Sequence, residues 1–490
     1  MADHNLARLA ESWQERRGDY ESLFFEGEWH RSGALAERAR RLAGGLVELG
    51  VQPGDRVVVL MSNCPDVSVA YDAIWRAGAV LTPVIFLLTP PELHNLLASS
   101  EARLVITTPD LEAMAREAGA EALTTADLPL GDPIEIVSRR DDDLAALLYT
   151  GGTTGRSKGV MLSHEMLWHA GRAGYDASYV PGVNRGLVTL PLSHAYGLLV
   201  TVAGLHGREP GRATLLRWFD PVSFLSLAAE HGVQTSAVVP SMIQALLACP
   251  VEDFDLSELR YLVCGAAPLA PDLQRALAER LPQVELREGY GLTECCALVS
   301  ANPPGRTRAG SVGVPVDGVE VRIVDDHDEE LLQGEVGEIC CRSPFVMAGY
   351  WHDPELTAEA TRGGWLHTGD LGYVDGDGYL FVVDRKKDLI IRGGFNVFPR
   401  DVEDALLEHE AIAAAGVVGR PDAAHGEEVV AFVTLHDGCE AGEPELVQWA
   451  KRRLGGYKYP REIRIVLQVP LTPVGKVDRK ALRALAEGEE

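Results

Sequence analysis

The segment from Leu147 to Gly159 has the composition of a phosphate-binding loop. An apolar run, Leu147 to Tyr149, leads directly into four glycines and three threonines, with Lys158 near the end. Backbone N–H groups, hydroxyls and an ammonium group can together surround phosphate oxygens. The segment lacks the Gly-Lys-Ser/Thr ending of a Walker A loop, and the chain contains no GxGxxG fingerprint. Composition alone therefore favours phosphate binding and leaves an ordinary flexible turn as the alternative.

Six further motifs follow along the chain. They are Leu190–Gly197 with a histidine and a tyrosine, Gly265–Pro268, Tyr290–Glu294, Thr368–Asp370, the charged run Asp384–Asp388, and Pro473–Lys476. In this order they resemble the gate, adenine loop, core motif, ribose motif, hinge and lysine loop of the adenylate-forming superfamily. That superfamily groups acyl- and aryl-CoA synthetases, peptide-synthetase adenylation domains and luciferases, and the resemblance covers essentially the whole chain.

The resemblance implies a role for each motif residue. The residues that would hold the departing pyrophosphate are Thr150, Gly151, Gly152, Thr153, Thr154 and Lys158. Those that would bind the adenosine part are Gly265, Ala266, Ala267, Tyr290, Asp370 and Arg385. The implied catalytic residues are Lys476, Thr293 and His194, with Glu294 holding Mg²⁺ and Gly394 lining a passage for the thiol of CoA. ATP, Mg²⁺ and CoA are thus the expected cofactors and cosubstrates.

The chemistry explains why a lysine is expected at the reacting centre. Joining a carboxylate to the α-phosphorus of ATP brings two anions together, so catalysis depends on positioning and on cations. The chain has 45 Lys and Arg against 72 Asp and Glu, a formal charge of −27. It must therefore concentrate a few cations at this point. The ordinary alternatives are that Tyr290 is a core aromatic, Asp370 a turn residue and His194 a structural histidine.

The elements that position these residues alternate between strands and helices in the first third of the chain. We expect a helix over 35–49, strands over 56–61 and 103–107, and a helix over 91–99, a pattern typical of parallel sheet covered by helices. Strands over 186–190, 233–239 and 261–264 continue it. Short β runs between 310 and 349, including 319–324 and 338–342, predict a small barrel-like part or distorted sheet.

A charge cluster at residues 384–388 marks the expected domain boundary. Beyond it we expect helices over 399–408 and 444–454 and strands over 413–418, 428–435 and 462–467, which form an independent α+β domain. The prediction is an α/β protein with a large N-terminal adenylation domain, residues 1–385. A small mobile C-terminal domain, residues 386–490, would carry the catalytic lysine and rotate at Lys387 between the two half-reactions.

Charge and cysteine content exclude several classes. A net charge of −27 argues against binding nucleic acid. No apolar run approaches the roughly 18 residues of a membrane span. The first residues carry neither the basic region nor the apolar core of a signal peptide, so we expect a cytoplasmic protein. Eight cysteines with no CxxC pair predict buried thiols rather than disulfides or zinc, including the adjacent pairs 295/296 and 340/341.

The leading hypothesis is an ATP-dependent, AMP-forming ligase that adenylates an aryl or fatty acyl carboxylic acid and transfers it to CoA. Transfer to a carrier protein or an amine is an alternative. So is activation of another acid or of a small anion such as nitrite, with an aromatic amine as acceptor. Amino-acid adenylation and a non-catalytic AMP sensor are weaker alternatives. The acid pocket is expected between 197–204, 233–242 and 295–299, whose small and apolar residues favour an uncharged tail.

Three positions depart from the family pattern. Gly151 stands where Ser or Thr is usual, and Ser157 stands where Pro is usual. The lost hydroxyl removes a contact worth about 1–2 kcal/mol to a charged acceptor. Ile391 occupies a position where many aryl-CoA ligases carry a second lysine, which argues against close equivalence to the plant aryl-CoA enzymes.

Overall fold

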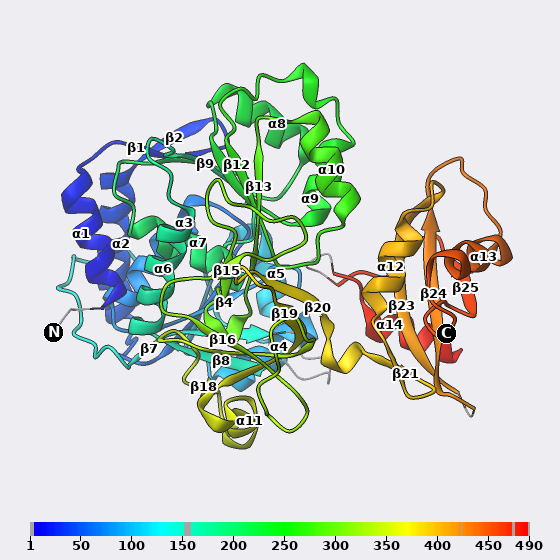
Figure 1. Ribbon diagram of the computed structural model, residues 1–490. Helices are drawn as coiled ribbons and strands as arrows, with labels where there is room; N and C mark the ends of the chain where they lie inside the picture. The colour runs from blue at the N-terminus through cyan, green and yellow to red at the C-terminus, as the bar shows by residue number, and fades with distance from the viewer. Residues whose placement is uncertain (1–3, 151–157, 423, 473–475, 489–490) are drawn as a thin grey trace. The chain divides into compact units, whose positions relative to one another are not determined.

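The computed structural model of the protein describes residues 4–150, 158–422, 424–472 and 476–488 (Figure 1). The chain divides into two compact units. The first is Met1–Val321 with Cys341–Leu366, and the second is Arg322–Cys340 with His367–Glu490. The sequence places a boundary between residues 385 and 386, where the mobile C-terminal domain is expected to begin. This boundary describes movement rather than compactness, and it stays a prediction.

The first unit contains two large sheets. The nine-stranded sheet has the order β15-β14-β13-β12-β11-β9-β10-β1-β2, and the seven-stranded sheet has the order β18-β8-β7-β4-β3-β5-β6. The strands of the first sheet are β1 (Glu21–Phe25), β2 (Glu28–Arg31), β9 (Arg185–Val188), β10 (Arg212–Leu215), β11 (Thr235–Val238), β12 (Tyr261–Cys264), β13 (Glu285–Tyr290), β14 (Ser300–Ala301) and β15 (Val314–Pro315). Those of the second are β3 (Arg56–Leu60), β4 (Val80–Val84), β5 (Leu104–Thr107), β6 (Ala122–Thr124), β7 (Leu144–Thr150), β8 (Lys158–Ser163) and β18 (Gly349–Tyr350).

Helices cover both sheets of this unit. They are α1 (Leu6–Arg17), α2 (Ser32–Glu48), α3 (Pro65–Arg76), α4 (Pro90–Ser100), α5 (Glu112–Glu117), α6 (His164–Ser178), α7 (Ala195–Leu205), α8 (Pro221–Glu230), α9 (Pro240–Leu247), α10 (Pro271–Arg280) and α11 (Pro354–Ala360). Several begin with proline, whose fixed φ and missing N–H suit the first turn of a helix. At α4 this start is reinforced by a capping box between Thr89 and Glu92.

Successive buried residues of β3 point to opposite faces of the sheet, and each face is covered by helices. Val57 and Val59 pack with α2, α3, α6 and α7 in the largest core cluster. Val58 and Leu60 point the other way and pack with α4 and α5. A strand that is buried on both faces is typical of parallel sheet. In the other sheet α8, α9 and α10 form a separate core with β11 and β12, and Figure 1 shows these helices beside the green strands.

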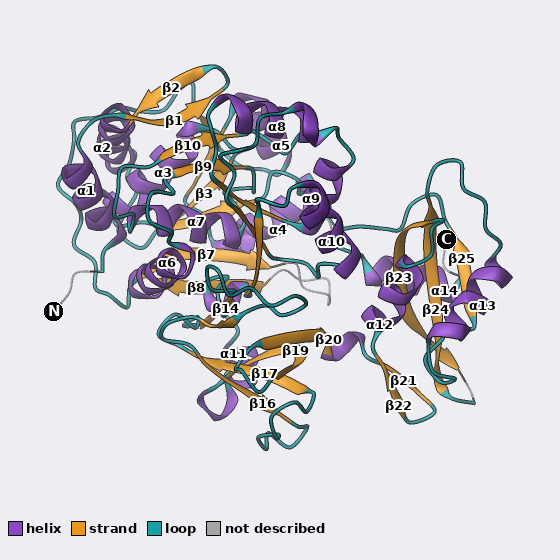
Figure 2. Cartoon of the chain, turned by 45° about the horizontal axis from the view of Figure 1, so that its top comes forward, coloured by secondary structure: helices purple, strands orange, loops and turns teal. Residues whose placement is uncertain are grey.

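The second unit combines a four-stranded and a five-stranded sheet. The first has the order β16-β17-β19-β20, and Figure 2 shows these strands side by side. Its strands are β16 (Glu320–Val324), β17 (Gly337–Arg342), β19 (Leu366–Val374) and β20 (Leu380–Arg385). The second has the order β22-β21-β24-β23 with β25 also paired to β24. Its strands are β21 (Ile390–Arg392), β22 (Phe395–Val397), β23 (Ile412–Asp422), β24 (Gly426–Leu435) and β25 (Glu462–Ile465).

Three helices cover the five-stranded sheet. They are α12 (Pro399–Leu407), α13 (Glu443–Arg453) and α14 (Arg479–Glu487). Side chains of α12 and α13 pack with Val429, Ala431 and Val433 of β24, whereas α14 packs with the alternate residues Val430 and Phe432. The sheet is therefore enclosed on both faces, and the loop that carries Lys476 leads directly into α14.

The predicted fold class is confirmed, and most predicted elements are found within a few residues of their expected ends. The strand over 261–264 and the helix over 399–408 agree almost fully with β12 and α12. Of the β runs between 310 and 349, β16 and β17 lie in the four-stranded sheet, whereas β15 lies in the nine-stranded sheet. Both adjacent cysteine pairs are buried, as expected, whereas Cys249 is only partly buried and Cys439 is exposed. None of the helices in the described residues has the length and apolar character needed to cross a membrane.

A buried ion pair ties α14 to α12 and yields a stability prediction. The Arg479 guanidinium donates to both oxygens of Glu403, at 2.9 and 3.0 Å, and one of these oxygens also accepts the Val417 N–H. Burial raises the pKa of Glu403 to about 7, against the opposing effect of Arg479. Arg479→Met leaves this carboxylate without its cation and should cost about 3 kcal/mol of unfolding free energy at pH 8, measured by urea titration.

The same titration at pH 5 should give a smaller loss, because there Glu403 takes up a proton and no longer needs a cation. The exposed pair of Arg116 and Glu112 on α5 supplies the control. Arg116→Met should leave the unfolding free energy nearly unchanged. Equal losses for the two variants, or a loss for Arg479→Met that is the same at both pH values, would contradict this interpretation.

Candidate active site

Several predicted site residues of the first unit lie at one edge of its nine-stranded sheet, whereas Thr150 and Lys158 belong to the seven-stranded sheet. Strands β9, β11, β12 and β13 are parallel neighbours. The loop after β9 carries His194, the loop after β12 carries Gly265–Ala267, and Tyr290 ends β13 just before Thr293 and Glu294. Ligands of open α/β sheets bind outside the carboxyl ends of parallel strands. The topology therefore brings these segments to the edge where a ligand is expected.

The gate segment and the adenine-side loop are in direct contact. His194 caps α7, and its Nδ1 accepts the Tyr196 N–H at 3.2 Å. The Tyr196 hydroxyl donates to the carbonyl of Val263 at 3.3 Å, and a Cβ added at Gly265 would lie 3.7 Å from the tyrosine ring. Burial raises the pKa of Tyr196, so this phenol stays neutral. The tyrosine thus forms a fixed wall beside Gly265.

A strained turn holds Thr293 and Glu294. The N–H groups of Cys295 and Ala297 both donate to the carbonyl of Leu292, at 2.9 and 2.8 Å. Cys296 and Ala297 have φ values of 48° and 63°, a left-handed conformation that is unfavourable for residues with a Cβ. A Cβ at Gly291 would lie only 2.2 Å from the carbonyl carbon of Ala297, so only glycine fits there. Backbone strain of this kind persists where the surroundings fix the chain, and it clusters at functional sites.

A tyrosine connects Glu294 with Lys158. The Tyr350 hydroxyl donates to Glu294 Oε1 at 2.8 Å, and the Lys158 ammonium lies 5.2 Å from the centre of the Tyr350 ring. Strand β18 places the tyrosine there by pairing with β8, with Tyr350 opposite Val160. Burial and the Glu294 carboxylate raise the pKa of Tyr350. Sequence analysis missed this residue, because its position depends on pairing between strands far apart in the chain.

The two ends of the expected phosphate loop are placed next to each other. Thr150 ends β7 and pairs directly with Lys158 at the start of β8. The other loop residues, Gly151, Gly152, Thr153 and Thr154, lie outside the described residues. The structure therefore places Thr150, Lys158 and Glu294 in one region of the first unit, together with Tyr350.

In the second unit three cations gather around one carboxylate. Asp370 on β19 pairs with Arg385 on β20, and the Arg385 Nε lies 3.4 Å from Asp370 Oδ1. Burial, Arg385 and Lys387 lower the pKa of Lys476 to about 8, against the opposing effect of Asp370. Burial and Arg385 likewise lower the pKa of Lys387. Burial is the largest cause of both shifts and the neighbouring cations add to it, so a bound anion would favour the charged forms of these lysines.

The lysine turn has a defined backbone. The Lys476 N–H donates to Thr472 Oγ1 at 3.2 Å, and the Thr472 N–H donates to the Lys476 carbonyl at 2.7 Å. Residues 473–475, between them, lie outside the described residues. These two bonds bring Thr472 and Lys476 together, and Lys476 lies before α14 rather than in it.

Gly394 lies in the turn between β21 and β22. Gly393 and Gly394 have φ values of 58° and 82°, which favour glycine. A Cβ at Gly394 would meet nothing within 4 Å, so crowding does not require glycine here. The positive φ value is the reason that glycine is favoured at this position. Ile391, in the neighbouring strand, is exposed. The role of Gly394 toward a thiol stays a prediction.

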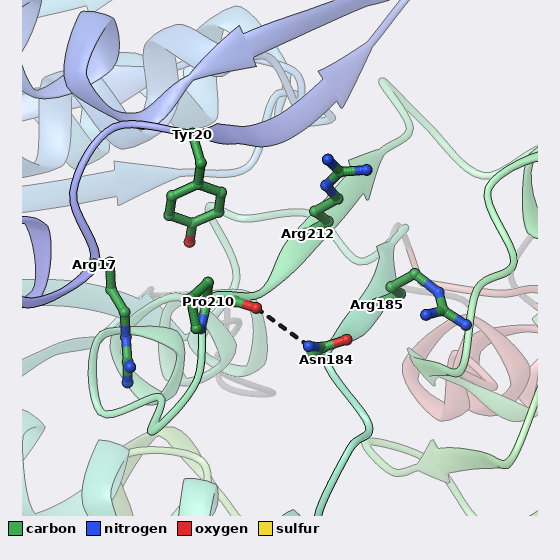
Figure 3. A pocket seen from close by; sticks show the side chains of 6 residues that line it. All are labelled: Arg17, Tyr20, Asn184, Arg185, Pro210 and Arg212. Carbon is green, nitrogen blue, oxygen red and sulfur yellow. Dashed lines mark hydrogen bonds between the residues drawn. The ribbon is translucent and has the colours of Figure 1, made fainter.

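A polar hollow of about 390 Å³ lies elsewhere in the first unit (Figure 3). Its lining includes Arg185 and Arg212, which begin β9 and β10, so it lies at the opposite edge of the sheet from the predicted site residues. Arg185 pairs with Glu258 at 2.8 Å and Arg212 with Glu21 at 3.5 Å. The arginine side chains in Figure 3 point in different directions. This hollow is not the candidate site, because it lies at the wrong edge of the sheet and its arginine side chains do not converge.

Comparison with known proteins identifies the family. The model described as "AMP-binding enzyme" matches residues 10–351, and "AMP-binding enzyme C-terminal domain" matches residues 401–476. The chain is 38% identical to feruloyl-CoA synthase from an Amycolatopsis species over 92% of both chains. It is 37% identical to 4-coumarate–CoA ligase 5 of Oryza sativa, over 94% of this chain and 90% of that one.

Solved structures agree with these matches. ATP-bound MatB from Rhodopseudomonas palustris superposes with a TM-score of 0.91 at 32% identity, over 100% of both chains. The amide bond synthetase McbA from Marinactinospora thermotolerans superposes with a TM-score of 0.88 at 31% identity, over 98% of this chain and 99% of that one. The chain belongs to the AMP-binding enzyme family. It is an enzyme of the ATP-dependent, AMP-forming ligase class, of the acyl-CoA synthetase type.

The hydroxyl of Tyr350 gives a prediction for this site. Tyr350→Phe removes the hydrogen bond to the Glu294 carboxylate but keeps the ring beside Lys158. A hydrogen bond to a charged group contributes about 1.5–3 kcal/mol, so kcat/KM for acid-dependent ATP–pyrophosphate exchange should fall by at least about tenfold. Tyr175→Phe is the control, because that hydroxyl lies on α6 and accepts the Arg208 N–H. If Tyr350→Phe catalysed ATP–pyrophosphate exchange at the wild-type rate, Tyr350 would not be part of the active site.

Proposed function

We propose that this enzyme activates an aromatic carboxylic acid with ATP and transfers the acyl group to CoA. In the first step the carboxylate attacks the α-phosphorus, and pyrophosphate leaves. In the second, the CoA thiol attacks the acyl carbon, AMP leaves and the thiol proton is released. The observation that carries the proposal is the cluster of Arg385, Lys387 and Lys476 around Asp370, because it combines an excess of positive charge with a carboxylate suited to ribose hydroxyls.

The proposed roles in adenylation are those that the resemblance to the adenylate-forming superfamily implies. Lys476 balances the approaching carboxylate and the α-phosphate, and Thr293 donates to the α-phosphate. Asp370 and Arg385 hold the ribose, whereas Tyr290 and the Gly265–Ala267 loop bound the adenine. His194 contacts the substrate carboxylate. The proposed pyrophosphate loop consists of Thr150, Gly151, Gly152, Thr153, Thr154 and Lys158.

Glu294 is the residue that would hold Mg²⁺. Its side chain is half-buried on a rigid turn, and one carboxylate oxygen accepts from Tyr350. Among the described residues no group of three or more His, Cys, Asp and Glu side chains is arranged to hold a metal ion. This donor set fits Mg²⁺, which is usually bound by one or two carboxylates together with substrate phosphates rather than by a protein cage. When bound, Mg²⁺ would neutralise charge on the phosphate oxygens.

The acid is proposed to be aromatic because feruloyl-CoA synthase and 4-coumarate–CoA ligase are named for aromatic acids. The expected pocket segments agree with an uncharged tail. Helix α7 contributes Leu198, Leu199 and Val202 to the core, and the pocket segment 295–299 is largely buried. An amine acceptor is the second candidate, favoured by the similarity to the amide bond synthetase McbA.

We further propose that residues 386–490 move as the C-terminal domain between the two steps, with the pivot at Lys387. The separate match of the C-terminal family model supports a distinct domain. In this proposal one pose presents Lys476 for adenylation, and the other presents the turn at Gly394 for the pantetheine arm.

The direct test measures AMP release over a panel of acids, with CoA, with an aromatic amine and with neither acceptor. The panel contains aromatic acids, long-chain fatty acids, sulfoacetate and nitrite. We expect aromatic acids with CoA to give the highest kcat/KM. AMP release that requires an amine instead would establish the second candidate, and release with fatty acids or nitrite alone would contradict the aromatic assignment.

Lys476→Ala separates the two half-reactions. We expect adenylation to fall by at least about a hundredfold, the lower range for losing one charge-stabilising group. Thioester formation from chemically prepared acyl-AMP should stay near the wild-type rate. The control is Lys480→Ala, four residues further on in α14. Adenylation by Lys476→Ala at the wild-type rate would show that another residue performs this step.

The depressed pKa of Lys476 predicts an alkaline limit for adenylation. The ammonium must carry its charge to balance two anions, so kcat/KM should be level below pH 8 and fall as the pH rises through the pKa of about 8. Lys476→Arg should move this decline beyond about pH 10, because a guanidinium stays protonated there. An unchanged decline in Lys476→Arg would assign the titration to another group.

A further inference from the structure

Lys386, the residue before the proposed pivot, is bound by two carboxylates of its own unit. Its ammonium lies 2.9 Å from Asp326 Oδ1 and 3.2 Å from Glu338 Oε2. Burial opposes this charge, but the hydrogen bonds of Asp326 and Glu338 outweigh it and raise the pKa of Lys386. The next residue, Lys387, has its pKa lowered instead. Two consecutive lysines therefore have opposite environments, and Lys386 is the anchored one.

Glu338 connects this anchor to the ribose motif. Its side chain is only 6% exposed, on β17. While Oε2 takes the Lys386 ammonium, Oε1 accepts the Gly369 N–H at 3.2 Å. Gly369 has a φ of 70° and directly precedes Asp370. One carboxylate thus joins the hinge to a left-handed kink at Gly369 within β19, which we call the Gly369 turn and which directly precedes Asp370.

The turn around Asp370 has further supports on the same strands. Thr368 Oγ1 donates to the carbonyl of Ile339 at 2.7 Å and accepts the Asp370 N–H at 3.1 Å. His367 Nδ1 lies 3.5 Å from Glu338 Oε2 and 3.2 Å from Cys340 Sγ. A buried carboxylate needs a cation and hydrogen-bond donors, and removing one of them is costly. Glu338 therefore holds Lys386 and Gly369 at the same time.

We propose that Glu338 is a positioning residue for adenylation, and that its pair with Lys386 holds the first hinge residue to this sheet. Rotation then begins after Lys386, one residue later than the proposed domain boundary, and does not disturb the backbone that presents Asp370 to the ribose. This inference rests on the proposed function, because it assigns the ribose to Asp370 and the pivot to Lys387. Neither Glu338 nor Lys386 needs to touch the nucleotide.

The first test measures hydrogen exchange of the backbone amides at residues 366–371 in the full-length protein. Lys386→Gln removes the ammonium, so the Glu338 carboxylate is expected to leave Gly369. Protection in this segment should fall by about fivefold or more, within the range of coupling for neighbouring charged groups. Asp326→Asn is the matched control, because Asp326 binds the same ammonium but is the more exposed of the two carboxylates. Unchanged protection in Lys386→Gln would overturn the proposal.

The second test is a double-mutant cycle of Glu338→Gln and Lys386→Gln, read as KM for ATP and KM for the acid. Each single variant should raise KM for ATP several-fold and leave KM for the acid unchanged, and the double variant should be no worse than either. If the increases in KM for ATP of the two single variants added up in the double variant, the coupling would be overturned. An equal increase in KM for ATP in Asp326→Asn would overturn it as well. If the wild type shows no acid-dependent exchange, the proposed function fails, whereas the hydrogen-exchange result still decides whether Lys386 supports the Gly369 turn.

Discussion

Positive charge held in excess around Asp370 is the constraint on which the chemistry of this enzyme depends. The exposed Arg385 and Lys387 repel the partly buried ammonium of Lys476, in a chain whose formal charge is −27. The fold maintains this arrangement with a strand pair that places Arg385 opposite Asp370 and with two hydrogen bonds between Thr472 and Lys476. In the proposed function, a bound phosphate would relieve this repulsion, which would favour nucleotide binding.

The first unit prepares a complementary set of groups by a different route. Parallel strands deliver His194, the Gly265–Ala267 loop and the Tyr290–Glu294 segment to one sheet edge, and a strained turn fixes the last of these. Tyr350 then orients the Glu294 carboxylate. Rigid placement of donors and charges before the substrate arrives is the main source of rate enhancement in phosphoryl and acyl transfer. In the proposed function, the groups of the first unit would act mainly on the phosphates and those of the second unit on the ribose and the reacting centre.

The sequence predicts features that depend on residues close together in the chain better than features that depend on residues far apart in it. Local periodicity and turn residues are sufficient for β12 and α12, and the motif order is sufficient for the family. Tyr350 and Glu338 could not be found in this way, because their roles arise from strand pairs between distant segments and neither has a distinctive local pattern. The apolar run along β24 predicts a strand but not that α14 covers its second face. Side-chain networks are therefore the part that requires the structure.

The most direct measurement is the pKa of the Lys476 ammonium, observed by NMR with lysine labelled at Nζ, in the free enzyme and with AMP bound. Lys476→Arg serves to assign the signal. The excess-charge interpretation predicts a pKa near 8 in the free enzyme and a rise of at least about one unit with AMP, because the phosphate favours the charged form. A pKa near the ordinary lysine value in the free enzyme, with no change on AMP binding, would contradict it.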